Sequence, residues 1–126
     1  MPSETRVRRV AERIRTDLSE ILLRGAEDPR LSGVTITDVE VDRELAFATI
    51  FVTALQGEER REDVLNGLKH ASGFLRSALA KSIQLRSFPQ LRFRWDDSLE
   101  QGTRIDALLK AVREQERNAD GGASQG

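Results

Sequence analysis

The cations in the second half of the chain are the residues whose types and spacing indicate chemistry. Residues 69–94 hold six Lys and Arg and no Asp or Glu, although the net charge of the whole chain is only −1. Such a segment repels itself unless it faces a polyanion or is neutralised by acids elsewhere in the fold. We interpret it as a phosphate-binding surface; the alternative is a solvated face balanced by the acid-rich residues 27–68. The cations are Lys69, Arg76, Lys81, Arg86, Arg92 and Arg94.

A second group of cations lies near the amino terminus, on a segment with helical periodicity. Five arginines occur within ten positions there, which favours a basic contact surface over an exposed helix with internal ion pairs. This group would widen the footprint of a polyanion. Its members with this expected role are Arg6, Arg8, Arg9 and Arg13.

Residues suited to catalysis or metal binding are scarce. The single histidine, His70, has no Cys partner and no metal-binding spacing, and the chain contains no P-loop or Gly-x-Gly-x-x-Gly motif. Neighbouring acids Asp96 and Asp97 would point apart on a strand, so we interpret them as capping residues. A row of acids at spacing two favours a charged strand edge over a metal site. These acids are Asp38, Glu40 and Asp42.

The composition is typical of one small folded domain. The chain has 126 residues, 38% of them hydrophobic and 33% charged, and no Cys, which excludes disulfides and thiolate chemistry and fits the cytoplasm. No apolar run reaches the ~20 residues that a membrane helix needs, and no secretory signal is evident. Aromatic residues make up only 5%, so we expect backbone contacts to dominate any nucleic-acid binding.

The first half of the chain predicts a helix followed by a hairpin. Apolar residues at helical spacing indicate a helix over 3–24, and Asp28-Pro29-Arg30 indicates a turn. Residues 34–41 and 45–53 are rich in β-branched and aromatic residues and predict two antiparallel strands joined at 42–44.

The second half predicts a long helical region and a third strand. Helical spacing continues from Val64 to Arg86, and Ala71-Ser72-Gly73 in its middle predicts a kink or a break into two helices. Residues 91–95 alternate as a strand, and a last helix begins near Glu100. The order is that of an α+β fold with the helices on one face of a three-stranded sheet, as in the bacterial-type (type II) K-homology module. We expect this domain over residues 1–115 and a disordered tail over 116–126.

Short motifs along residues 5–112 resemble the ribosome-binding factor A family. Each motif alone is weak, but their ordered combination is specific. One departure is Asp42, where a Ser is frequent in the family. The matching pieces are Arg8-Arg9-Val10, Asp28-Pro29-Arg30-Leu31, the strand 34–41, Ala71-Ser72-Gly73-Phe74-Leu75-Arg76, Leu85-Arg86, Pro89-Gln90-Leu91-Arg92-Phe93, Asp96-Asp97-Ser98 and Arg104-Ile105.

The resemblance implies a bacterial protein with a single K-homology fold that is not an enzyme and needs no cofactor or metal. Such proteins bind free 30S subunits during late assembly and assist 16S rRNA maturation and growth in the cold. Ala71, Ser72 and Gly73 would replace the usual Gly-x-x-Gly loop. Other assembly factors, GTPases among them, are further candidate partners of an expected monomer. The alternatives are a general RNA-binding or protein-interaction module and, from the acids, a nuclease acting on rRNA precursors.

Overall fold

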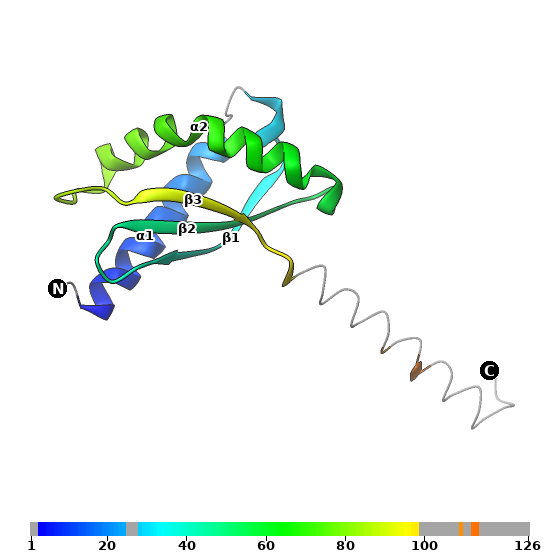
Figure 1. Cartoon of the computed structure of the whole chain (residues 1–126), viewed down its shortest axis with the longest axis horizontal. Helices are drawn as coiled ribbons and strands as arrows, with labels where there is room; N and C mark the ends of the chain where they lie inside the picture. Colours follow the sequence, from blue (N-terminus) through cyan, green and yellow to red (C-terminus); the bar gives the residue numbers. More distant parts are fainter. Residues whose placement is uncertain (1–2, 25–27, 99–108, 110–111, 114–126) are drawn as a thin grey trace, which may run out of the picture. The chain divides into compact units, whose positions relative to one another are not determined.

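The computed structural model describes residues 3–24, 28–98, 109 and 112–113, which contain two α-helices and one sheet (Figure 1). The predicted α+β order is confirmed up to the third strand. The chain divides into two units, residues 1–96 and 97–126, and most of the second unit, including the predicted tail over 116–126, lies outside the described residues. The elements of the first unit are α1 (Glu4–Leu23), β1 (Val34–Val41), β2 (Phe47–Ala54), α2 (Arg61–Ser82) and β3 (Gln90–Trp95), with 3-10 turns at Pro29–Leu31 and Gly57–Arg60.

The sheet has the order β1-β2-β3, with β2 in the centre. β1 and β2 form the predicted antiparallel hairpin, whose register shifts between Ile36 and Asp38. β3 joins the other side of β2 in parallel orientation, after the chain has crossed over through α2. Parallel neighbours need such a crossover, and here the crossover helix brings α2 against β3.

The hairpin turn is held by one carboxylate. Asp42 Oδ1 accepts hydrogen bonds from the backbone N–H groups of Ala46 and Phe47, both at 2.8 Å. Leu45 adopts a φ of 57°, a left-handed conformation that is uncommon for a leucine. The Asp42 carboxylate therefore has a structural role in the turn.

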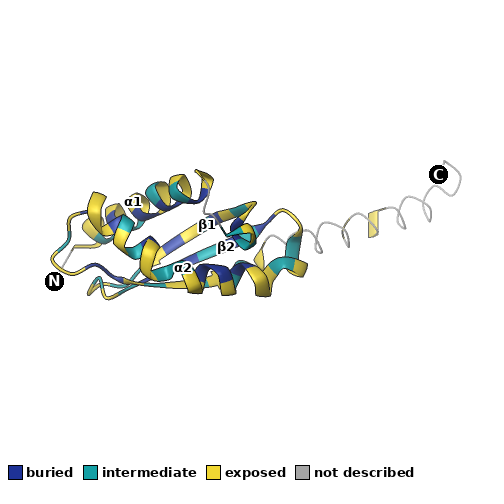
Figure 2. Cartoon of the chain, turned by 90° about the horizontal axis from the view of Figure 1, so that it is seen from above, coloured by how far each residue is buried: buried dark blue, intermediate teal, exposed yellow. Residues whose placement is uncertain are grey.

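Each element buries one side in a single core. Ser3 caps the N-terminus of α1, and its side chain accepts a hydrogen bond from the N–H of Arg6 at 3.1 Å. α1 packs on β1 and α2 on β3, and Figure 2 shows exposed residues along the outer sides of both helices. The predicted arrangement of the helices on one face of the sheet is confirmed. Core residues recur at helical spacing in Val10, Ile14, Leu18 and Leu22 of α1, and at every second position in Ala48, Ile50, Val52 and Ala54 of β2.

The helix α2 is one uninterrupted helix of 22 residues that runs through Ala71–Gly73. The alternative of a break into two helices is therefore wrong. A central glycine costs about 1 kcal/mol relative to alanine, but the burial of Leu68 and Leu75 in the same helix offsets that cost. The helix ends at Ser82, four residues before the predicted end, because Ile83 has extended backbone angles. The prediction was too long because the Ile83 side chain continues the apolar spacing of the helix.

Candidate nucleic-acid interface

A groove runs between α2 and the edge strand β3. It consists of two adjoining hollows of about 340 and 160 Å³ that share Ser72 and Leu91. Sequence patterns had indicated Lys69, Ser72, Gly73 and Arg76 of the α2 wall and Arg92 of the β3 wall. They had not indicated Gln90, Leu91 and Phe93, because the parallel pairing of β3 is invisible in the sequence. The residues that line it are Leu65, Asn66, Lys69, Ser72, Gly73 and Arg76 from α2, and Gln90, Leu91, Arg92 and Phe93 from β3.

The α2 wall presents an exposed cation and bare backbone. Lys69, Ser72 and Arg76 follow at steps of three and four, so they share one flank of the helix. The Ser72 hydroxyl donates to the Lys69 carbonyl at 2.9 Å. A Cβ atom added at Gly73 would meet no atom within 4 Å beyond its chain neighbours and the adjacent helix backbone, so the helix is open to a ligand at this point.

Arg76 is held by backbone carbonyl groups. Its Nε donates to the Pro89 carbonyl at 3.1 Å and its Nη2 to the Phe88 carbonyl at 2.5 Å. These bonds tie α2 to the segment that leads into β3 and so fix the mouth of the groove. Arg76 lies at the predicted site, but its guanidinium is hydrogen-bonded to two backbone carbonyls of the protein itself.

The two β3 arginines project to the opposite side of the sheet from the helices. Arg92 and Arg94 alternate with Phe93 and Trp95, which face the core, and are exposed. The guanidinium carbon of Arg92 lies 3.6 Å from the centre of the Phe47 ring. Arg92 also borders the groove that Lys69 lines, but its guanidinium lies over Phe47, on the sheet face turned away from the helices.

The remaining predicted cations lie on further surfaces. Lys81 is five residues from Arg76, which places it about 140° around the helix axis, away from the groove. Arg86 is exposed on the segment between α2 and β3. At this end of α2, Arg13 Nη2 donates to the Ser82 carbonyl at 3.2 Å and ties α1 to α2.

The α1 arginines divide between two flanks of the helix. Arg6, Arg9 and Arg13 recur at steps of three and four on the flank that meets α2. Arg8 shares the other flank with Glu4, which pairs with Arg43 of the hairpin turn at 3.6 Å. The cations expected to contact a polyanion therefore lie on more than one surface of the protein.

Two of the acids considered for catalysis form hydrogen bonds within the fold. Thr37 Oγ1 donates to Asp96 Oδ2 at 2.5 Å, and Asp42 holds the hairpin turn. Within the described part of the chain, no three His, Cys, Asp or Glu side chains are grouped to hold a metal ion.

The ion pair between Asp28 and Arg30 lowers the pKa of the Asp28 carboxyl. Arg30 contacts both carboxylate oxygens of Asp28, with Nη2 2.6 Å from Oδ2. Hydrogen bonds from the Arg30 side chain and backbone lower the pKa of Asp28 from 3.8 to about 2. The pair stabilises the turn at Pro29–Leu31, which packs against α2.

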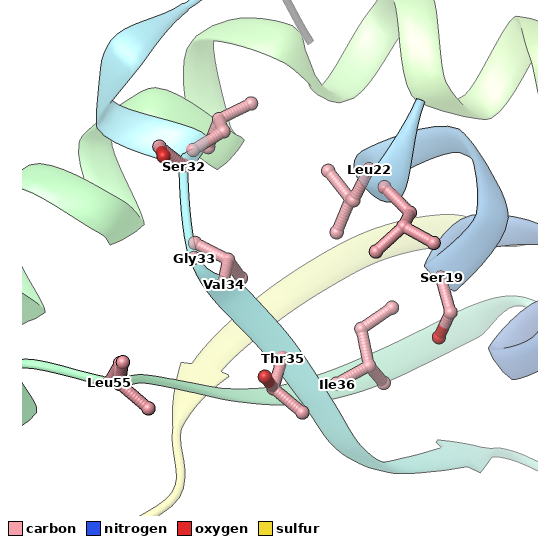
Figure 3. A pocket seen from close by; sticks show the side chains of 10 residues that line it. Ser19, Leu22, Ser32, Gly33, Val34, Thr35, Ile36 and Leu55 are labelled. Atoms are coloured by element: carbon pink, nitrogen blue, oxygen red, sulfur yellow. The ribbon is translucent and has the colours of Figure 1, made fainter. Parts of the chain in front are cut away.

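A larger hollow of about 540 Å³ lies where α1 ends and β1 begins (Figure 3). Leucine, valine and isoleucine side chains dominate its lining, and none of the described residues that line it is a cation. It adjoins Leu23 and Leu55, which are 87% and 93% exposed. This hollow is unsuited to phosphate binding.

Within the described residues, no helix is long and apolar enough to cross a membrane.

The chain is similar to known proteins along most of its length. The family model for ribosome-binding factor A matches residues 6–109. The ribosome-binding factor A of Aromatoleum aromaticum is 42% identical over 113 residues, covering 89% of both chains. That of Clostridioides difficile is 44% identical over 115 residues, covering 90% of both chains.

Solved structures resemble the fold as well. The crystal structure of ribosome-binding factor A from Thermus thermophilus matches with a TM-score of 0.64 and 27% identity, over 71% of this chain and 93% of that one. A solution structure of a Thermotoga maritima protein described as a putative ribosome binding factor A matches with 0.63 and 30%, over 75% and 90%. A Thermus thermophilus homology model fitted into the map of a 30S complex matches with 0.58 and 29%, over 69% and 91%.

Proposed function

Because this chain belongs to the ribosome-binding factor A family, we propose that it binds free 30S ribosomal subunits and not 70S ribosomes. There it assists late maturation of the subunit and 16S rRNA processing, and it supports growth in the cold. It acts in the cytoplasm as a monomeric binding protein, without catalysis or a cofactor. The observation that carries the proposal is the family match over residues 6–109, and the Thermus thermophilus relative fitted into a 30S complex supports it.

The groove between α2 and β3 is the proposed site of rRNA contact. Lys69 supplies a cation there, and the open backbone at Gly73 lets a sugar-phosphate chain approach closely. Lys81, Arg86 and the α1 arginines extend contact to neighbouring phosphates. Phosphate contacts position a protein without reading sequence, so recognition of the subunit rests on rRNA shape.

Co-sedimentation with separated subunits tests this function. We expect the purified chain to pellet with 30S subunits, to stay in the supernatant with 50S subunits and 70S ribosomes, and to dissociate as salt rises. Pelleting with none of the particles would contradict the proposal and favour a general RNA-binding or protein-interaction module. Release of the chain from a ribosomal fraction by RNase would then distinguish those two.

Variants of the groove test the proposed site. Lys69→Glu places an acid among the proposed phosphate contacts without removing a structural bond, and we expect it to abolish pelleting. Lys81→Glu tests the other flank of α2. Arg24→Glu is the matched control, because its side chain is 79% exposed and lies at the far end of α1. Loss of pelleting in the Arg24 variant alone would refute the assignment.

The open backbone at Gly73 has its own test. Gly73→Val adds bulk where no protein atom lies, so the fold tolerates it while a close ligand does not. We expect weaker pelleting with 30S subunits and an unchanged circular dichroism spectrum. Wild-type pelleting would show that no RNA backbone approaches this position.

A further inference from the structure

The sheet face turned away from the helices carries an ordered set of aromatic and charged side chains. We propose that this open face is a second RNA-binding surface, which takes a short single-stranded segment with its bases on β2. The proposal concerns unpaired RNA and does not depend on the choice of ribosomal particle. Six residues define the open face: Asp38 and Glu40 of β1, Phe47 and Phe51 of β2, and Arg92 and Arg94 of β3.

The two phenylalanines are placed for stacking and are not part of the core. Phe47 and Phe51 alternate with the buried residues of β2 and are half-buried themselves. Neither belongs to the core or packs against it, in contrast to Phe88 and Phe93. They are four residues apart on one strand, about 13 Å, so one base would stack on Phe51 and another on the Arg92 guanidinium that covers Phe47. Bases stack well on such rings whatever their identity.

The arginines stand on one side of these rings. In the parallel register, Arg94 lies beside Phe51 and Arg92 beside Thr49, and the Arg92 guanidinium already covers the Phe47 ring at 3.6 Å. Within the described residues, neither arginine forms an ion pair with an acid. Phosphates would therefore follow β3, the strand that carries the positive charge.

The acids stand on the other side of the rings and set the polarity of the site. Asp38 lies opposite Phe51, and Glu40 lies opposite Thr49. Because adjacent strands are about 4.8 Å apart, these carboxylates lie roughly 10 Å from the β3 arginines across the sheet. They repel phosphates but accept hydrogen bonds from exocyclic amino groups of bases. The open face should therefore bind cytidine or adenosine runs better than uridine runs, because uracil has no amino group.

This charge order favours RNA over a protein as the occupant. The arginines lie on β3, the aromatic rings on β2 and the acids on β1. A nucleotide presents its phosphate, the plane of its base and the edge of its base in the same order. The low aromatic content had indicated that backbone contacts dominate. The structure nevertheless gathers two of the chain's five phenylalanines outside the core on this one face.

Binding of short RNA oligomers to the full chain tests the proposal. Oligocytidine and oligouridine of equal length are titrated into the chain labelled with 15N, and amide resonances are followed by NMR. We expect amides of β2 and β3 near Phe51 and Arg94 to shift, with tighter binding of oligocytidine. Shifts confined to α2 and the groove, or no binding of either oligomer, would overturn the proposal and leave a protein as the occupant of this face.

Three substitutions separate the contributions of ring, cation and acid. Phe51→Leu should weaken oligocytidine binding about five-fold or more, since stacking on an aromatic ring is lost. Arg94→Gln should lower the slope of log affinity against log salt by about 0.7. Asp38→Asn should reduce the preference for cytidine over uridine.

A matched control variant shows whether loss of any phenylalanine, rather than of Phe51 in particular, weakens oligocytidine binding. Phe74→Leu makes the same change at a ring that is 69% exposed on α2, remote from the open face. We expect wild-type affinity for oligocytidine in that variant. Equal affinity in the Phe51 and Phe74 variants would overturn the assignment of the open face.

Discussion

Replacing either of two glycines of α2 by alanine should have opposite effects on stability. Gly73→Ala adds a methyl group to open space, whereas Gly67→Ala places one 3.0 Å from Arg30 Cβ and 3.1 Å from Leu31 Cδ2. Both variants gain about 1 kcal/mol of helix propensity. At Gly67, overpacking costs about 1–3 kcal/mol if the neighbour cannot move.

Arg30 is held in place on several sides, which decides the sign at Gly67. Its side chain contacts both oxygens of Asp28, and its carbonyl accepts a hydrogen bond from Arg60 at 2.8 Å. We therefore expect Gly67→Ala to lower the free energy of unfolding by about 1 kcal/mol, and Gly73→Ala to raise it by about 0.5–1 kcal/mol.

Urea unfolding followed by circular dichroism measures both variants against the wild type. The two midpoints should move in opposite directions, and the melting temperatures should differ by roughly 5–10 °C. If Gly67→Ala stabilises as much as Gly73→Ala, the turn yields to the methyl group without cost, and the argument for a rigid contact between the turn and α2 is refuted.

Three further substitutions probe the polar ties of the fold. Arg76→Met leaves the carbonyls of residues 88–89 without their donor and should cost about 1–3 kcal/mol of unfolding free energy in urea; an unchanged midpoint would contradict the role of Arg76 in the groove. Arg60→Met should cost a similar amount, because Arg60 donates to carbonyls of the turn at 29–32; calorimetry at neutral pH reports it, and a wild-type melting temperature would argue against this tie. The lowered pKa of Asp28 beside Arg30 means that its contribution to stability is present above pH 3.8 and is lost as pH falls toward about 2. Asp28→Asn should remove that part of the pH dependence from thermal unfolding curves, and identical curves for the two proteins across this range would contradict the pairing.

The local elements could be predicted from the sequence because their signals are local. The strand 34–41 has the same bounds in the structure, and the turn at 42–44 joins an antiparallel hairpin as expected. Alternation at 91–95 correctly separated the exposed arginines from the core residues of β3. The motifs that resembled a family also identified the family that the comparisons report.

The surfaces could not be predicted, because they depend on pairing between distant segments. The run of cations along the chain placed Arg76, Lys81 and Arg92 on one surface. In the structure Arg76 and Arg92 border the groove between α2 and β3, whereas Lys81 lies on another flank of α2. Arg76 carries a full charge in any sequence count, yet its partners are carbonyls twelve and thirteen residues away. Gly67 gave no signal because its contact is a turn more than thirty positions earlier.

The parallel attachment of β3 has a consequence for the order of folding. β1 and β2 meet through a short turn, while β2 and β3 pair residues about forty positions apart, which requires closing a much longer loop. We expect the hairpin to form early and β3 to dock late, and partial unfolding to release β3 first. Since β3 is one wall of the groove, the chain would lose its proposed RNA contact while most of its structure persists.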